Sequence, residues 1–157
     1  MTPPTTEPWQ NLATPPEDAV TAPWWAGTRE RTLLVQTCVT CGSAQHPPRS
    51  VCVACMSAEL GWTPVSGRAT VDSFTVVHRA PHPGLEVPYV LARVRLTEGP
   101  ILLTRIVDVD PAHPDAVRCD QPVTLAWVGL TDGRALPVFR PIPQTGDASP
   151  APTSQER

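Results

Sequence analysis

The sequence predicts a mainly β protein in which an N-terminal helix and a four-cysteine metal module precede a small five-stranded barrel. Three observations support this fold class. Two Cys-x-x-Cys pairs lie within residues 37–55, five runs rich in Val, Leu and aromatic residues follow residue 67, and residues typical of a helix start occur near residue 21. The 157 residues suffice for one domain with a small appended module.

Both ends of the chain have the composition of disordered tails. Six of the 21 prolines lie in the first 23 residues, and aliphatic side chains are few there. Such segments bury too little surface to offset the entropy lost on ordering. We therefore expect disordered tails at 1–20 and 142–157, the helix and metal module at 21–60, and the barrel at 61–141.

Charge and hydropathy restrict the compartment and the partners. The formal net charge is -3, and all twelve basic residues are arginine. The first residues contain no basic segment followed by an apolar one, and no stretch approaches the length of apolar sequence that a membrane span needs. We expect a cytoplasmic protein that does not bind membranes.

The helix is predicted to begin at Thr21, a typical N-cap residue, with Pro23 in the first turn where a missing N–H costs nothing. Trp24 and Trp25 follow directly. Two adjacent indoles are not expected to point into one small core, so one ring would pack inside while the other covers an edge. The alternative is a partner contact, because exposed tryptophan is enriched at interface hot spots.

The cysteine pairs predict a structural metal site. Zinc prefers four ligands in a tetrahedron, and each Cys-x-x-Cys turn supplies two sulfurs. The four ligands are Cys38, Cys41, Cys52 and Cys55. Zinc is favoured over iron, and a dithiol redox role is disfavoured because no βαβ pattern accompanies the motif. With four thiolates bound, the metal has no open position for substrate, so the site is predicted to be structural.

Two further residues, His46 and Cys119, are predicted to have structural roles only. His46, between the cysteine pairs, is predicted to be a surface loop residue, because the four sulfurs already complete the coordination shell. Cys119 is the cysteine left over, and we predict it to be a small buried side chain.

Five runs predict the barrel strands: 67–79, 88–96, 100–109, 121–130 and 135–141. The second run alternates, with Val90, Ala92, Val94 and Leu96 on one face and Leu91, Arg93 and Arg95 on the other. This period of two is typical of a sheet that covers a core on one side. Gly67 suits a strand that bends around a barrel corner.

Taken together, these motifs resemble a known family. The motifs are "TAPWWAGTRERTLLVQ", the two cysteine pairs with "PPR" between them, "SGRATVDSFTVVHRAP" and "LPVFRP". In this order they resemble, over residues 21–141, the bacterial and archaeal proteins that join a rubredoxin-like zinc ribbon to an OB-fold barrel. The resemblance implies that the predicted barrel is an OB-fold and that the metal is Zn²⁺.

The resemblance also implies a function. Members of that family act as small accessory subunits of thiolase-superfamily enzymes, or lie near hydratases, that process acyl-CoA, and some pair with aldolases that cleave steroid side chains. For this chain it implies a noncatalytic subunit of a hetero-oligomer that helps to form an acyl-CoA channel, with the catalytic residues on the partner. Residues 61–140 agree, since they contain one tyrosine, no lysine and no recognisable nucleophile with its base.

The loop "HRAPHPGLEVPY" is the predicted contact region of the barrel, because binding residues tend to lie on loops held by a rigid scaffold. The alternative is a strand connection with solvated histidines. The candidate contacts with a partner or acyl-CoA are Trp24, Trp25, His78, Arg79, His82 and Tyr89. Phe74 and Tyr89 could equally pack at the core or the barrel mouth.

Three arginines on polar strand positions, Arg93, Arg95 and Arg105, allow two interpretations. They could face a CoA phosphate, or they could pair with acidic residues, namely Glu98, Asp108 or Asp110. A solvated arginine face is the more common outcome.

Two other functions are compatible with the predicted domains. OB-folds and zinc ribbons bind nucleic acid elsewhere, but residues 61–140 carry eight arginines against eight acidic residues, so no net positive charge attracts phosphates. We therefore expect no nucleic-acid partner. An autonomous acyl-CoA-binding protein is the second alternative, and binding of CoA thioesters without a partner distinguishes it from a scaffold.

Overall fold

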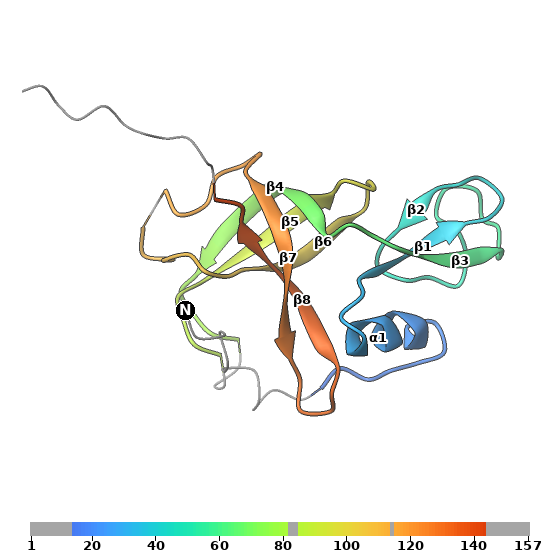
Figure 1. Ribbon diagram of the computed structural model, residues 1–157, viewed down its shortest axis with the longest axis horizontal. Coiled ribbons are helices and arrows are strands. Elements are labelled where there is room, and N and C mark those ends of the chain that lie inside the picture. The colour runs from blue at the N-terminus through green and yellow to red at the C-terminus, as the bar shows by residue number, and fades with distance from the viewer. Residues whose placement is uncertain (1–13, 82–84, 114, 144–157) are drawn as a thin grey trace, which may run out of the picture.

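The computed structural model describes residues 14–81, 85–113 and 115–143. A short helix and a small three-stranded sheet lie beside a closed five-stranded barrel (Figure 1). The elements follow the predicted order of helix, metal module and barrel, and the predicted fold class is confirmed.

The N-terminal part consists of α1 (Ala22–Arg29), β1 (Leu34–Cys38), β2 (Ala44–Gln45) and β3 (Leu60–Pro64). The strands pair antiparallel in the order β2-β1-β3. Because β3 pairs with β1 as far as Pro64, this three-stranded sheet extends beyond residue 60, where we predicted the metal module to end and the barrel to begin.

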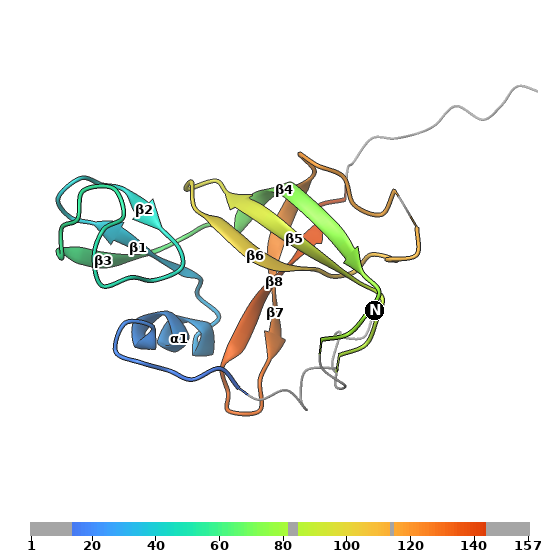
Figure 2. The ribbon, with the colours of Figure 1, turned by 180° about the vertical axis from the view of Figure 1, so that it is seen from behind.

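The barrel consists of β4 (Arg68–Val77), β5 (Tyr89–Leu96), β6 (Ile101–Ile106), β7 (Pro122–Gly129) and β8 (Ala135–Pro141). It closes in the order β4-β5-β6-β8-β7, and Figure 2 shows β5 and β6 from the side opposite to Figure 1. All five predicted strands are present. Gly67 has φ 74°, and a Cβ there would lie 2.7 Å from Leu125 Cβ, so the corner before β4 needs glycine.

The barrel core follows the alternation seen in the sequence. The inward-facing residues of β5, namely Val90, Ala92, Val94 and Leu96, are all buried. Arg93 and Arg95 point outward and share the carboxylate of Asp72, at 3.6 and 3.0 Å. This corrects the predicted pairing with Glu98, Asp108 or Asp110, because Asp72 lies on the neighbouring strand β4.

Both tryptophans of α1 join the core, which corrects the expectation that only one ring can pack inside. Trp24 is 8% exposed and Trp25 is 6% exposed, and the rings contact each other edge to face with centroids 4.5 Å apart. The helix lies between the ribbon and the β7–β8 hairpin (Figure 1), so the two rings pack against different partners. Trp24 lies beside His46 of the ribbon, whereas Trp25 lies beneath Arg134 of the hairpin.

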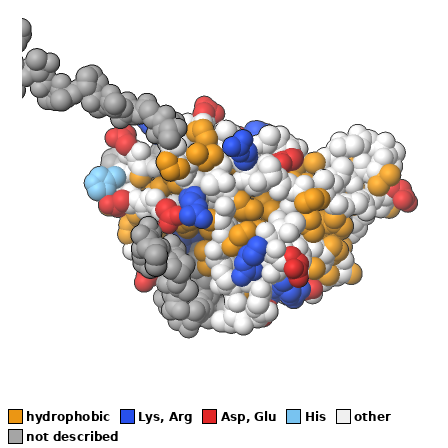
Figure 3. All heavy atoms as spheres, viewed as in Figure 1, with side chains coloured by type: hydrophobic (Ala, Val, Ile, Leu, Met, Phe, Trp, Pro, Cys, Tyr) orange, Lys and Arg blue, Asp and Glu red, His pale blue; other side chains and the backbone are white. Residues whose placement is uncertain are grey.

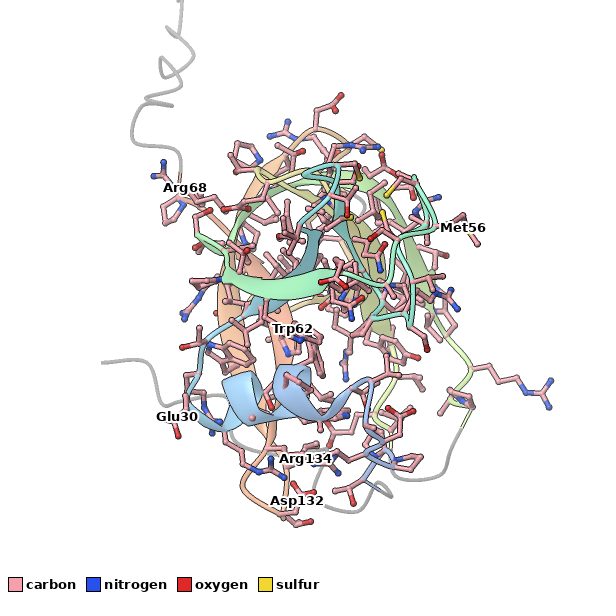
Figure 4. All side chains as sticks on the ribbon, turned by 90° about the vertical axis from the view of Figure 1, so that its right-hand side faces the viewer. Glu30, Met56, Trp62, Arg68, Asp132 and Arg134 are labelled. Carbon is pink, nitrogen blue, oxygen red and sulfur yellow. The ribbon has the colours of Figure 1, made fainter. Side chains whose placement is uncertain are left out.

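Arg134 fixes the helix to the barrel. Its guanidinium lies 4.3 Å from the centre of the Trp25 ring, and its Nε donates to Asp132 at 2.6 Å. The side chain is only 4% exposed. Figure 4 shows Arg134 and Asp132 just below the helix. A buried cation that has both an aromatic face and a carboxylate partner holds the hairpin in a defined position.

The helix begins where predicted, with Thr21 at the N-cap and Pro23 in the first turn, but Asp18 supplies the side chain that organises this start. Thr21 makes no capping hydrogen bond with its side chain. The Asp18 carboxylate accepts hydrogen bonds from the Thr21 hydroxyl at 2.8 Å and from the backbone N–H groups of Thr21 and Val20 at 2.8 and 3.0 Å. These bonds lower the pKa of Asp18, and the Thr21 hydroxyl contributes most. The described end of the predicted N-terminal tail is thus attached to the helix, while residues 1–13 lie outside the described part.

Thr28 connects the helix to the barrel, and its substitution tests this junction. It is fully buried, its hydroxyl donates to the carbonyl oxygen of Trp25 at 2.8 Å, and it accepts a hydrogen bond from Ala135 N–H. Thr28→Val keeps the shape and leaves that N–H without a partner. We expect the free energy of unfolding to fall by about 1–2 kcal/mol in urea denaturation. Thr75→Val, on an exposed site of β4, should change it by less than about 0.5 kcal/mol; equal losses would contradict this role of Thr28.

Candidate metal centre

The two Cys-x-x-Cys turns have the same backbone hydrogen bonds. Gly42 N–H donates to the carbonyl oxygen of Cys38 at 2.9 Å, and Met56 N–H donates to that of Cys52 at 2.9 Å. The residue after each pair has positive φ, 74° at Gly42 and 65° at Met56. The second turn therefore adopts the knuckle geometry without a glycine. Backbone N–H groups in such turns point toward the sulfurs, as Ala54 N–H does toward Cys52 Sγ at 3.4 Å.

The four sulfurs converge on one point. They lie within 4.8 Å of one another, and the Cys38–Cys55 and Cys41–Cys52 pairs are 3.6 Å apart. Zinc–sulfur bonds of about 2.3 Å in a tetrahedron put the sulfurs about 3.8 Å apart, so the donor set fits zinc. In each Cys-x-x-Cys turn the first cysteine, Cys38 or Cys52, is buried and the second, Cys41 or Cys55, is exposed.

Ionisation of the cluster favours a bound cation. Hydrogen bonds with Ser43 lower the pKa of Cys41 to about 6. The backbone hydrogen bond from Ser57 lowers the pKa of Cys55, but the neighbouring sulfurs, Cys41 foremost, together with desolvation outweigh it and raise that pKa to about 12. Four thiolates this close cannot all be charged unless a metal ion neutralises them.

Two buried glutamines that we did not predict hold the loop between the knuckles. Gln45 Nε2 donates to Gln36 Oε1 at 2.8 Å, and that oxygen also accepts from Arg49 N–H at 2.8 Å. Gln45 Oε1 accepts from Val53 N–H, and Gln36 Nε2 donates to the Arg49 carbonyl oxygen. Both side chains are at most 5% exposed. These hydrogen bonds therefore fix the loop between the two cysteine pairs.

This pair predicts a non-additive effect of mutation. Gln45→Leu leaves the Val53 N–H and one acceptor position of Gln36 unpaired, so we expect the free energy of unfolding to fall by about 1–3 kcal/mol. Gln36→Leu should do the same. In a double-mutant cycle followed by thermal unfolding, the two losses should fail to add by more than about 0.5 kcal/mol. Strict additivity would show that the amides act independently.

His46 is not the surface residue that we predicted. Its ring lies 5.9 Å from the centre of the Trp24 ring, and burial lowers its pKa to about 4. It is therefore uncharged at neutral pH. It is not a metal ligand, because the described cluster consists of the four sulfurs. Cys119, predicted to be buried, is exposed.

The other predicted contacts that the structure describes lie on or beside the β4–β5 loop. His78 and Arg79 are exposed on the β4–β5 loop. Tyr89 is 9% exposed and packs beneath Arg105, with the guanidinium 4.2 Å from the ring centre. His82 lies outside the described residues. Their contact with a partner or acyl-CoA remains a prediction.

The helix, the sulfur cluster and the closed barrel define a zinc-ribbon protein with an OB-fold barrel. The family models agree: residues 25–61 match the model described as "ChsH2, rubredoxin-like zinc ribbon domain", and residues 62–128 match "ChsH2, C-terminal OB-fold domain". The four cysteines are accordingly the ligands of a zinc ribbon.

Curated relatives and a solved structure extend this assignment. The chain is 38% identical over 122 residues to a "Probable enoyl-CoA hydratase alpha subunit" of Thermomonospora curvata, which covers 77% of this chain and 37% of that protein. It is 33% identical to a "DUF35 domain-containing scaffold protein" of Methanocaldococcus jannaschii, over 78% of this chain and 79% of the relative. A chain of the solved "Ltp2-ChsH2(DUF35) aldolase" is 37% identical with a TM-score of 0.73, covering 82% of this chain and 98% of that one.

The chain belongs to the DUF35 family, with the zinc-ribbon and OB-fold domains of ChsH2. It spans only about a third of the length of the hydratase alpha subunit that it matches. No helix in the described ranges is long and apolar enough to cross a membrane.

Proposed function

We propose that this chain is a noncatalytic subunit that binds a thiolase-superfamily enzyme and helps to form its acyl-CoA channel. The observation that carries the proposal is the match to the aldolase chain over 98% of that chain's length. Both the ribbon and the barrel of this protein therefore have counterparts in a subunit of an aldolase complex. The relatives' printed names, a scaffold protein and a hydratase alpha subunit, support the same role.

Exposed apolar side chains on the metal-binding turns support a partner surface. Val39, Val53 and Met56 are 74%, 66% and 71% exposed. We call these three residues the knuckle surface, and in Figure 4 Met56 points away from the ribbon. The three side chains belong to the two turns whose sulfurs converge, and exposed apolar groups that lie together are typical of interaction sites. The zinc ion would hold them in place by fixing both turns.

The surface charges do not favour the nucleic-acid alternative. On the face shown in Figure 3, acidic and basic side chains are intermixed. Two outward arginines of β5, Arg93 and Arg95, are already paired with Asp72. A groove that tracks a phosphate backbone would need unpaired positive charge.

The proposal is tested by purifying the tagged chain from its native host and identifying the proteins that remain bound by mass spectrometry. We expect a thiolase-fold enzyme in a fixed ratio to the chain. Val53→Asp with Met56→Asp should reduce its recovery at least about tenfold, since a charge in an apolar contact is costly. Thr75→Asp on β4 is the matched control. Recovery of a folded monomer without a thiolase-fold enzyme would overturn the proposal.

A further inference from the structure

A pocket of about 260 Å³ lies where the helix, the ribbon and the barrel meet. Trp24 of α1 and His46 of the ribbon form one wall, and residues of β5, β6 and β8 form the others. Four of the ten lining residues are leucines, and one of them, Leu103 of β6, is 70% exposed. The pocket therefore requires all three parts of the fold, although they are distant in the sequence.

The pocket exists because two barrel strands separate. β6 and β8 are in register at Ile106 and Phe139. Toward the start of both strands, a side-chain hydrogen bond connects them: the Thr104 hydroxyl donates to the Pro137 carbonyl oxygen at 2.7 Å. Pro137 has no N–H to donate in return. The opening beside this seam is bordered by Trp24 and His46.

The polar groups of the pocket are mostly hydrogen-bond donors. Trp24 Nε1 and His46 Nδ1 are buried, and neither has a hydrogen-bond partner among the residues that the structure describes. Arg105 is the one charged residue among the described residues that line the pocket. No carboxylate is among them. An oxygen acceptor is therefore the group that this lining lacks, since indole N–H and guanidinium can only donate.

We propose that this pocket binds an apolar ligand that carries a carbonyl or carboxylate oxygen, with that oxygen accepting the hydrogen bond of Trp24. A buried donor without a partner is unfavourable, and a ligand oxygen relieves this. At about 30 Å³ for each water-sized group, the volume holds about nine non-hydrogen atoms. The leucine walls would contact the apolar chain, and Arg105 favours a negative charge at its polar end.

His46 contributes as a neutral residue. Burial keeps its pKa near 4, so the ring adds no positive charge at neutral pH. In the tautomer that carries a hydrogen on Nδ1, it is a second donor beside Trp24. Because His46 belongs to the loop between the knuckles, the zinc ribbon supplies part of the pocket. The inference concerns the chain alone and does not depend on which enzyme is the partner.

The test uses the zinc-loaded full chain, labelled with ¹⁵N, and three probes of equal chain length: octanoate, octanamide and octylammonium. Trp24→Phe identifies the indole N–H signal of Trp24, and Trp62→Phe is the matched control. We expect octanoate or octanamide to shift that signal downfield in a saturable way. Binding of octanoate alone assigns a carboxylate ligand, and binding of octanamide alone assigns a neutral carbonyl; either supports the proposal.

Variants examine the donors separately. Arg105→Gln should weaken octanoate binding about tenfold, because a charged hydrogen-bond donor is lost. Arg93→Gln removes a charge from the neighbouring strand outside the pocket and should leave the affinity unchanged. The proposal is overturned if neither oxygen-bearing probe moves the Trp24 signal, or if octylammonium moves it as far. Equal octanoate affinity of folded Trp24→Phe and the unmodified chain would overturn it too.

Discussion

Cys52→Ser is expected to abolish tight zinc binding and to unfold the ribbon while the barrel stays folded. Cys52 is fully buried and its sulfur lies 3.6 Å from that of Cys41, so serine removes an inner ligand of the closed set. Structural zinc contributes about 10–16 kcal/mol of apparent binding energy in small peptides. The loop between the two cysteine pairs is otherwise held by the Gln36–Gln45 amides.

Metal analysis and NMR measure this effect. We expect the zinc content to fall from about one ion per chain to a trace. Signals of residues 38–60 should lose their dispersion, and those of the barrel strands should keep it. Cys119→Ser is the matched control, because Cys119 is an exposed cysteine outside the cluster. A ribbon that remains folded and zinc-free in Cys52→Ser would contradict a structural role for the metal.

Phe139→Ala is expected to lower the free energy of unfolding by about 3–5 kcal/mol. Phe139 is fully buried and pairs with Ile106 of β6 and Leu125 of β7, so it lies where the barrel closes. Removing the ring leaves a cavity, and β8 cannot move to fill it because it is paired with β6 on one side and with β7 on the other. Urea denaturation followed by circular dichroism measures the loss.

Leu103→Ala controls for the removal of an apolar side chain from the same region. Leu103 is 70% exposed on β6, so its truncation should change the free energy of unfolding by about 0.5 kcal/mol or less. If Phe139→Ala and Leu103→Ala lowered the free energy of unfolding by similar amounts, burial of Phe139 where the barrel closes would not explain the stability of the barrel.

The elements that could be predicted are those that leave a local pattern. The alternation of Val90, Ala92 and Val94 depends only on which face of a strand each residue occupies. The spacing of the cysteines likewise follows from the reach of a single turn. Both patterns lie within a few residues of sequence, so the strands and the metal ligands could be read from it.

What could not be predicted depends on contacts between distant segments. Glutamine and arginine usually lie at the surface of a protein. Three of them are buried here, because their polar atoms form hydrogen bonds within the fold: Gln36, Gln45 and Arg134. His46 is half-buried because Trp24, 22 positions earlier, packs against it. The only sequence signal for these contacts was the unusual Trp pair, which we interpreted as having one ring at an edge.

The helix explains how the zinc ribbon and the barrel act as one unit. Trp24 contacts the ribbon and Trp25 contacts Arg134 of the barrel hairpin, so the two rings connect the metal site with the OB-fold. A scaffold subunit needs such a fixed arrangement, because a partner that touches both parts must meet them at constant positions. The metal ion would thus contribute to assembly without taking part in chemistry.

The central proposal is that this chain is a noncatalytic subunit that binds an acyl-CoA enzyme and helps to form its acyl-CoA channel. The most direct test is the turnover of an acyl-CoA by the purified thiolase-fold partner, measured alone, with increasing amounts of this chain, and with the Cys52→Ser variant. We predict that kcat/KM rises until the chain reaches a fixed ratio to the partner, that the variant gives no rise, and that the chain alone gives no turnover. Unchanged turnover on addition of the chain, or turnover by the chain alone, would contradict the claim.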